Sequence, residues 1–192
     1  MCDDKYREST KKMVNSVLKK LGTNDSFVMK RVFGKTVAEA DISTYIAFLN
    51  LTGNGSQNNI SYHEEADFLL VSLICTNESL RSFGIAKNGT TSFQELLGRL
   101  YLDSTKSMKR KICRLITLDI TSDGEFTSLF SYIFRVLKSH YDTKDLDYES
   151  LLYDLRRWNL NTTYMNSARK SWARTIVHNE ISENIENSNT SD

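Results

Sequence analysis

Proline is absent from the 192-residue chain, and only 8 residues are glycine, so few positions would interrupt a helix. No apolar run approaches the ~20 residues of a membrane-spanning helix, and the charged opening MCDDKYRESTKK is unlike a signal peptide. Three scattered cysteines (Cys2, Cys75 and Cys113) are too few for a disulfide framework or a zinc site. These absences predict a cytoplasmic, largely helical protein with no membrane contact.

Signatures of catalysis are missing as well. His63, His140 and His178 are isolated from one another, and none has the spacing of a metal site or a Ser/His/Asp triad. The sequence contains no P-loop and no GxGxxG motif. We therefore expect no catalytic residue, no metal and no cofactor.

The apolar pattern favours an all-α fold. Apolar residues make up 40% of the chain, enough for a packed core, and few runs alternate in the manner of a strand. Helical spacing predicts about eight helices, with a short one near residues 27–34 and others at Tyr6–Leu21, Asp41–Leu51, Phe68–Leu73, Phe93–Tyr101, Thr105–Leu118, Phe126–Leu137 and, as a pair, within Leu146–Val177.

Two polar segments divide this pattern. Residues 52–60 and 81–90 predict loops, and the second separates an N-terminal lobe (1–83) from a C-terminal bundle (84–177) packed against it. Ser61 with Glu64 predicts a capping box. Residues 178–192 predict a disordered acidic tail.

Local detail follows from the same rules. Asn24, Asp25 or Ser26 would cap the short helix, and Asp103 or Ser104 the helix that ends at Leu118. In the helix over 41–51, the spacing predicts that the side chains facing inward are Ile42, Tyr45, Ile46 and Leu49.

The segment from Leu146 to Val177 combines aromatic and basic faces. Trp158 and Trp172 fall on the apolar stripes of its two helices, which predicts that both are core residues. The basic residues opposite those stripes predict an outer face made of Arg156, Arg157, Arg169, Lys170 and Arg174.

Charge is uneven along the chain. The four acids of residues 178–192 leave residues 1–177 with a net charge of +5. Lys106, Arg110 and Arg114 recur at i, i+4, i+8 and form one ridge along the predicted helix. Phosphate would supply the missing counter-charge. A solvated face paired with acids elsewhere in the fold explains the same pattern.

The order of motifs resembles the small subunit of type I-E Cascade, the CasB family. The motifs are Met29-Lys30-Arg31, the Ser92–Leu100 helix with Gly98 and Arg99, Lys111–Thr117, DYESLLYDLRRW and SARKSWARTIV. The resemblance spans residues 26–177, although Thr175 replaces an acid of the last motif.

This resemblance implies a two-lobed, all-helical, non-catalytic subunit of a crRNA-guided CRISPR surveillance complex for antiviral defence. Its partners would be other Cascade subunits, crRNA and target DNA, with head-to-tail self-association inside the complex. Basic faces would contact the nucleic-acid backbone independently of sequence and stabilise the R-loop, including the displaced strand.

Ten residues are the candidate phosphate contacts. Lys30, Arg31 and Arg99 rest on matched motif positions. The others rest on helical clustering and are Lys109, Arg110, Arg114, Arg156, Arg157, Lys170 and Arg174. Two alternatives remain open at this point: a free-standing helical DNA-binding regulator, and a protein-interaction scaffold whose basic faces pair with acidic partners.

Overall fold

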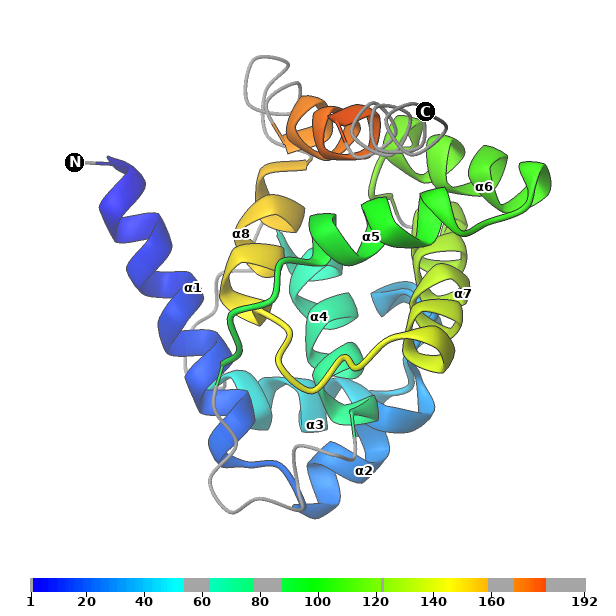
Figure 1. The fold of residues 1–192 in the computed structure, drawn as a ribbon. Coiled ribbons are helices and arrows are strands. Elements are labelled where there is room, and N and C mark those ends of the chain that lie inside the picture. The colour runs from blue at the N-terminus through cyan, green and yellow to red at the C-terminus, as the bar shows by residue number, and fades with distance from the viewer. Residues whose placement is uncertain (1, 54–62, 78–87, 122, 159–167, 179–192) are drawn as a thin grey trace, which may run out of the picture.

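The computed structural model describes residues 2–53, 63–77, 88–121, 123–158 and 168–178 (Figure 1). Within these ranges the chain is helical, without a strand, so the all-α prediction is confirmed. The helices are α1 (Cys2–Lys19), α2 (Asn24–Arg31), α3 (Ile42–Thr52), α4 (Glu64–Thr76), α5 (Phe93–Leu102), α6 (Lys106–Thr117), α7 (Glu125–His140) and α8 (Tyr148–Trp158). A 3-10 turn, η1 (Val37–Glu39), and a C-terminal segment (168–178) complete them.

Helix α4 forms the centre of the fold. Every residue from Ala66 to Cys75 is buried, because α1, α2, α3 and α8 all pack against this helix. Figure 1 shows α8 between α1 and α4, with α2 and α3 at the opposite end of the molecule from the C-terminal segment. A helix apolar on all sides is expected where neighbours surround it.

Helix α3 turns inward only part of the face that was predicted, since Tyr45 and Leu49 pack half-buried against the core. Ile42 and Ile46 are 81% and 51% exposed, whereas Phe48 and Leu51 are buried. The ring of Phe48 packs on Phe68 of α4, with 5.4 Å between centroids. Because α3 is apolar on two faces, its spacing alone did not identify the buried face.

The N-cap residues of α2 and α6 are each adjacent in sequence to the residues that were predicted. The hydroxyl of Thr23, not a side chain of residues 24–26, accepts a hydrogen bond from the Ser26 amide at the start of α2. Thr105 occupies the N-cap position of α6, where Asp103 or Ser104 was predicted. At α3, Asp41 accepts from the Thr44 amide at 2.7 Å, as a carboxylate cap does.

Two linkers pair through their backbones and fix the start of α8. The Thr91 amide donates to the Asp145 carbonyl at 2.7 Å, and a side chain at Gly89 would lie 2.1 Å from that carbonyl. Glycine is therefore required at this crossing. The side-chain oxygen of Asn88 accepts from the Tyr148 amide at 2.8 Å, so the linker before α5 caps α8.

Several predictions fall on residues outside the described ranges. They are most of the loops at 52–60 and 81–90, Ser61 of the predicted capping box, and the tail beyond residue 178. The division into lobes at residues 83 and 84 stays a prediction.

Candidate nucleic-acid interface

A pocket of about 370 Å³ between α2 and α7 is lined by four cations. Lys30 and Arg31 come from the last turn of α2, and Arg135 and Lys138 come from α7. Its other lining residues are Phe33, Thr76 and Phe134, and no acid is among the lining residues that the structure describes. We call Lys30, Arg31, Arg135 and Lys138 the cation pocket.

Close packing after α2 brings these four residues together. The rings of Phe33 and Phe134 meet edge to face at 5.8 Å between centroids. Gly34 has a φ of +97°, and a side chain there would lie 2.6 Å from the Ser131 hydroxyl. The backbone after α2 can therefore lie directly on α7, and Arg135 donates to the Phe33 carbonyl at 3.3 Å.

The charges of the pocket act on one another. Burial and the nearby Lys30 ammonium lower the pKa of Lys138, in that order of importance. Lys138 also donates to the Thr76 carbonyl at 2.9 Å, at the end of α4. Like charges held in one pocket favour an anion between them, and phosphate is an anion that arginine and lysine both bind.

The ridge on α6 consists of Lys106, Arg110 and Arg114 and is here called the α6 ridge. It is exposed to solvent along its length. Arg114 forms an ion pair with Glu125, so the alternative of pairing within the fold holds for this residue. Among the residues that the structure describes, Lys106 and Arg110 have no ion pair. Lys109 lies off the ridge, with its ammonium 4.8 Å from the centroid of the Tyr101 ring.

Helix α7 connects the ridge to the cation pocket. Arg114 pairs with Glu125 at the start of α7, and Lys111 covers the ring of Tyr132, 4.2 Å from its centroid, so two cations of α6 contact the first half of α7. Each helical residue turns by about 100°, so Tyr132, Arg135 and Lys138 fan across neighbouring parts of one surface. Because α7 contacts both groups of cations, we refer to the cation pocket, Lys111 and the α6 ridge together as the basic band.

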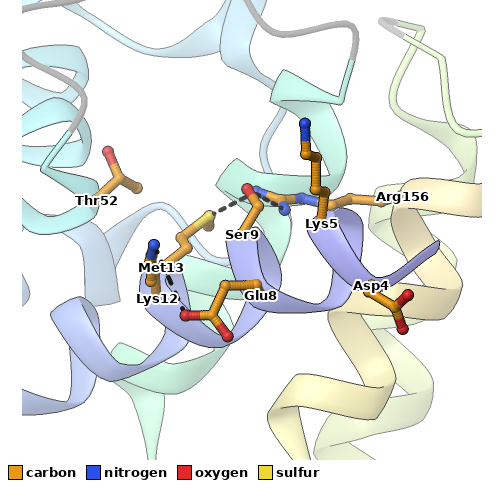
Figure 2. Close-up of a pocket in the computed structure, with 8 residues that line it drawn as sticks. All are labelled: Asp4, Lys5, Glu8, Ser9, Lys12, Met13, Thr52 and Arg156. Atoms are coloured by element: carbon orange, nitrogen blue, oxygen red, sulfur yellow. Dashed lines mark hydrogen bonds and ion pairs between the residues drawn. The ribbon is translucent and has the colours of Figure 1, made fainter. Parts of the chain in front are cut away.

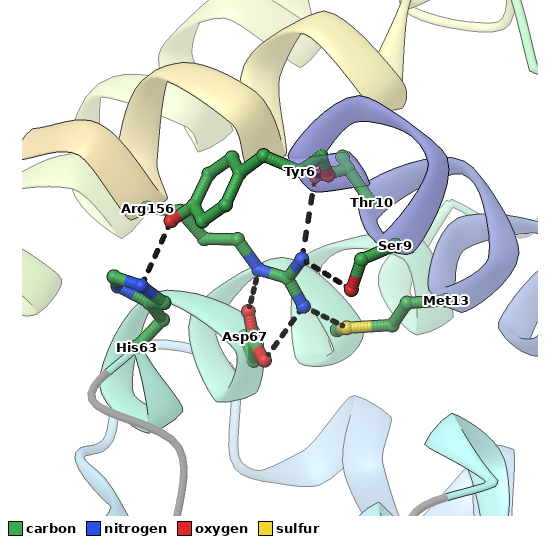
Figure 3. Close-up of polar contacts among 7 residues, drawn as sticks. All are labelled: Tyr6, Ser9, Thr10, Met13, His63, Asp67 and Arg156. Atoms are coloured by element: carbon green, nitrogen blue, oxygen red, sulfur yellow. Dashed lines mark hydrogen bonds and ion pairs between the residues drawn. The ribbon is translucent and has the colours of Figure 1, made fainter. Parts of the chain in front are cut away.

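Arg156 does not lie on an outer face, and its predicted position is wrong. Its side chain is 6% exposed and donates to both carboxylate oxygens of Asp67, at 2.6 and 2.9 Å (Figure 3). Thr10 accepts a further hydrogen bond at 3.3 Å. Burial raises the pKa of Asp67, and the hydrogen bonds and charge of Arg156 oppose that rise. This guanidinium is engaged in holding α8 against α1 and α4.

The groove above Arg156 has mixed charge. Figure 2 shows it along α1, with the guanidinium beneath Ser9 and Met13. Acids and bases alternate on its rim, where Lys12 lies 3.7 Å from Glu8. A surface of both signs is unsuited to a polyanion, so this groove is not part of the interface.

The remaining predicted residues lie on other surfaces. Arg99 is exposed on α5, and Arg157 is half-buried, 4.6 Å from the centroid of the Tyr153 ring. Lys170 and Arg174 are exposed on the C-terminal segment. Their neighbour Arg169 turns inward, contrary to prediction.

Arg169 serves the packing of the C-terminal segment. It donates to the carbonyls of Thr117 and Leu118 at 3.3 and 2.9 Å and pairs with Asp119. A cation at these carbonyls complements the end of α6. Trp158 and Trp172 are fully buried with ring centroids 4.8 Å apart, which confirms both as core residues.

Sequence reasoning missed Arg135 and Lys138. They are separated by apolar residues inside the most apolar stretch of the C-terminal half, so no charge cluster is visible there. Arg135 and Lys138 are three residues apart, and this spacing indicates that they share one face of a helix. Only the folded structure brings Lys30 and Arg31, from a distant segment of the sequence, into the same pocket.

Two further features, a metal-binding cluster and a membrane-spanning helix, are not found in the described part of the chain. No group of three or more His, Cys, Asp or Glu side chains there could hold a metal ion. No helix among the same residues is long and apolar enough to cross a membrane.

Comparison with known families decides the relationship. The family model described as CRISPR-associated protein Cse2 matches residues 27–175. The chain belongs to the Cse2 family. Cse2 is also called CasB and is a type I-E protein, so the resemblance seen in the motifs is confirmed.

A solved structure has the same fold as this Cse2 chain. It is described as a CRISPR RNA-guided surveillance complex, and the superposition has a TM-score of 0.66 at 12% sequence identity. The match covers 94% of this chain and 98% of the other. At that identity the likeness concerns the fold alone. None of the curated proteins matches the sequence.

Proposed function

We propose that this chain is the small subunit of a type I-E crRNA-guided Cascade and that its basic band holds nucleic-acid backbone. The family match and the fold shared with a surveillance-complex chain support the first part. The cation pocket carries the second part, because four basic side chains from two helices converge there without an acid among its described lining residues. Other Cascade subunits, crRNA and target DNA are the proposed partners, and the subunit catalyses no reaction.

Backbone contacts of this kind can decide the outcome of R-loop formation. The RNA–DNA hybrid that forms is about as stable as the DNA duplex that opens, so small additional contributions shift the balance. Phosphate contacts carry no base information and release counterions, which makes them independent of sequence and dependent on salt. Exposed Arg99, Lys170 and Arg174 would extend the same contact to other surfaces of the subunit.

The test removes two pocket charges that belong to no matched family motif. In a reconstituted complex, Arg135→Gln with Lys138→Gln should weaken target binding and R-loop formation. The log–log slope of affinity against salt should become shallower by up to about two, since each lost phosphate contact contributes about 0.9.

A matched control removes two charges elsewhere. Lys5→Gln with Lys12→Gln takes the same net charge from the mixed groove on α1, outside the basic band. This variant should keep the wild-type salt slope. Equal slopes for the wild type and the pocket variant would exclude the cation pocket as a backbone contact.

A further inference from the structure

Two exposed aromatic rings lie on the two helices that supply the cations of the pocket. Phe27 and Tyr132 are 45% and 42% exposed, and the other large exposed apolar residues in the described chain are aliphatic. Phe27 precedes Lys30 and Arg31 by three and four residues on α2. Tyr132 precedes Arg135 by three residues on α7. Each ring therefore lies on the same helix face as cations of the pocket.

Both rings are exposed although their helices bury neighbouring apolar residues in the core. Helix α2 buries Met29, and α7 buries Phe130, Ile133 and Phe134 directly beside Tyr132. The Tyr132 ring faces outward under the Lys111 ammonium and makes no hydrogen bond with the described residues. Exposed aromatic rings that alternate with cations are the pattern of proteins that bind single strands, in which bases stack on the rings and cations hold the phosphates.

We propose that Phe27 and Tyr132 are stacking platforms for unpaired bases of a single-stranded nucleic acid whose backbone lies in the cation pocket. This inference rests on the proposed function and adds to it the two rings on which bases of the strand would stack. Bases in a duplex are stacked on one another and cannot reach a protein ring without leaving the helix. A base on Tyr132 would place its own phosphate within reach of Lys111 and Arg135.

The experiment compares two DNA strands with the same phosphates. The purified full-length chain is titrated with oligothymidylate and with an abasic strand of equal length. Wild-type protein should bind the thymidine strand more tightly, by about tenfold for each ring that stacks a base. Tyr132→Leu and Phe27→Leu should each reduce this preference, and Tyr132→Phe should keep it.

Charge removal separates the two claims. Arg135→Gln with Lys138→Gln should weaken binding of both strands alike and leave their ratio unchanged. Equal affinity of the wild type for the two strands, or an unchanged ratio in both leucine variants, would overturn the stacking platforms while leaving backbone contact in place. If the wild type bound neither strand, the backbone contact would fail together with this inference.

Discussion

Arg156 and Asp67 form an ion pair that is almost entirely removed from water, since the two residues are 6% and 1% exposed. Taking both charges out of solvent costs several kcal/mol for each ion, and the paired hydrogen bonds at 2.6 and 2.9 Å offset that cost only while both partners are present. The pair joins α8 to α4, and the bond to Thr10 adds α1. Its main effect is therefore to specify how three helices meet.

Removing one partner should be far more damaging than removing both. Arg156→Ala leaves the Asp67 carboxylate buried without its counter-charge, so we expect the free energy of unfolding to fall by about 3–5 kcal/mol in a denaturant titration. The double variant Arg156→Met with Asp67→Leu should recover most of that loss. Arg31→Ala, at an exposed site, is the control and should change stability by less than about 0.5 kcal/mol. A loss below about 1 kcal/mol for Arg156→Ala would contradict this description.

His63 adds a pH dependence to the same contact. Its side-chain Nε2 lies 2.8 Å from the Tyr6 hydroxyl, and burial together with the Arg156 charge lowers its pKa. Above the unfolded-state value of about 6.5, His63 is neutral in both states and its contribution is complete. As the pH falls below that value, the unfolded chain binds the proton first, so stability decreases until the folded-state pKa is passed.

The difference between two proteins isolates this effect from other titrating groups. His63→Gln cannot bind the proton, so its stability should fall less than that of the wild type between pH 7 and pH 5. Thermal midpoints of the two proteins, measured across that range, give the comparison. Parallel curves would show that His63 does not sense pH.

At the scale of the elements, the sequence predicted where helices occur better than which side chains they present. The buried stripes of α7 and α8 were predictable because apolar residues recur there on one face only. On α3 apolar residues occur on two faces, and the choice depends on Phe68 of another helix.

The candidate site was predictable only where basic residues are adjacent in sequence. Lys30 with Arg31 and the α6 ridge are visible as clusters, and the structure leaves them at the surface. Arg156 was misplaced because its partner Asp67 lies 89 residues away, so nothing local reveals the ion pair. Arg135 and Lys138 were missed for the converse reason, since the pocket exists only once α2 and α7 pack.

At the scale of the whole molecule, two surfaces of the described chain differ in the sign of their charged side chains. The groove on α1 mixes acids with bases, whereas the basic band carries one acid in an ion pair, Glu125 with Arg114. That carboxylate neutralises one cation of the α6 ridge and would repel a passing phosphate. The position of a bound polyanion on the subunit should therefore depend on the charges of the basic band rather than on the net charge of the protein.

Glu125 offers a test in which binding improves. Glu125→Gln frees Arg114 without adding a cation, so affinity for a single strand should rise a few-fold and the salt slope should steepen by up to about 0.7. The acid also lies in the first turn of α7, so stability should fall by about 0.3–1 kcal/mol. Glu8→Gln makes the same change in net charge at the Lys12 pair on α1 and should leave affinity unaltered. If both variants bound equally more tightly, net charge and not the basic band would control binding.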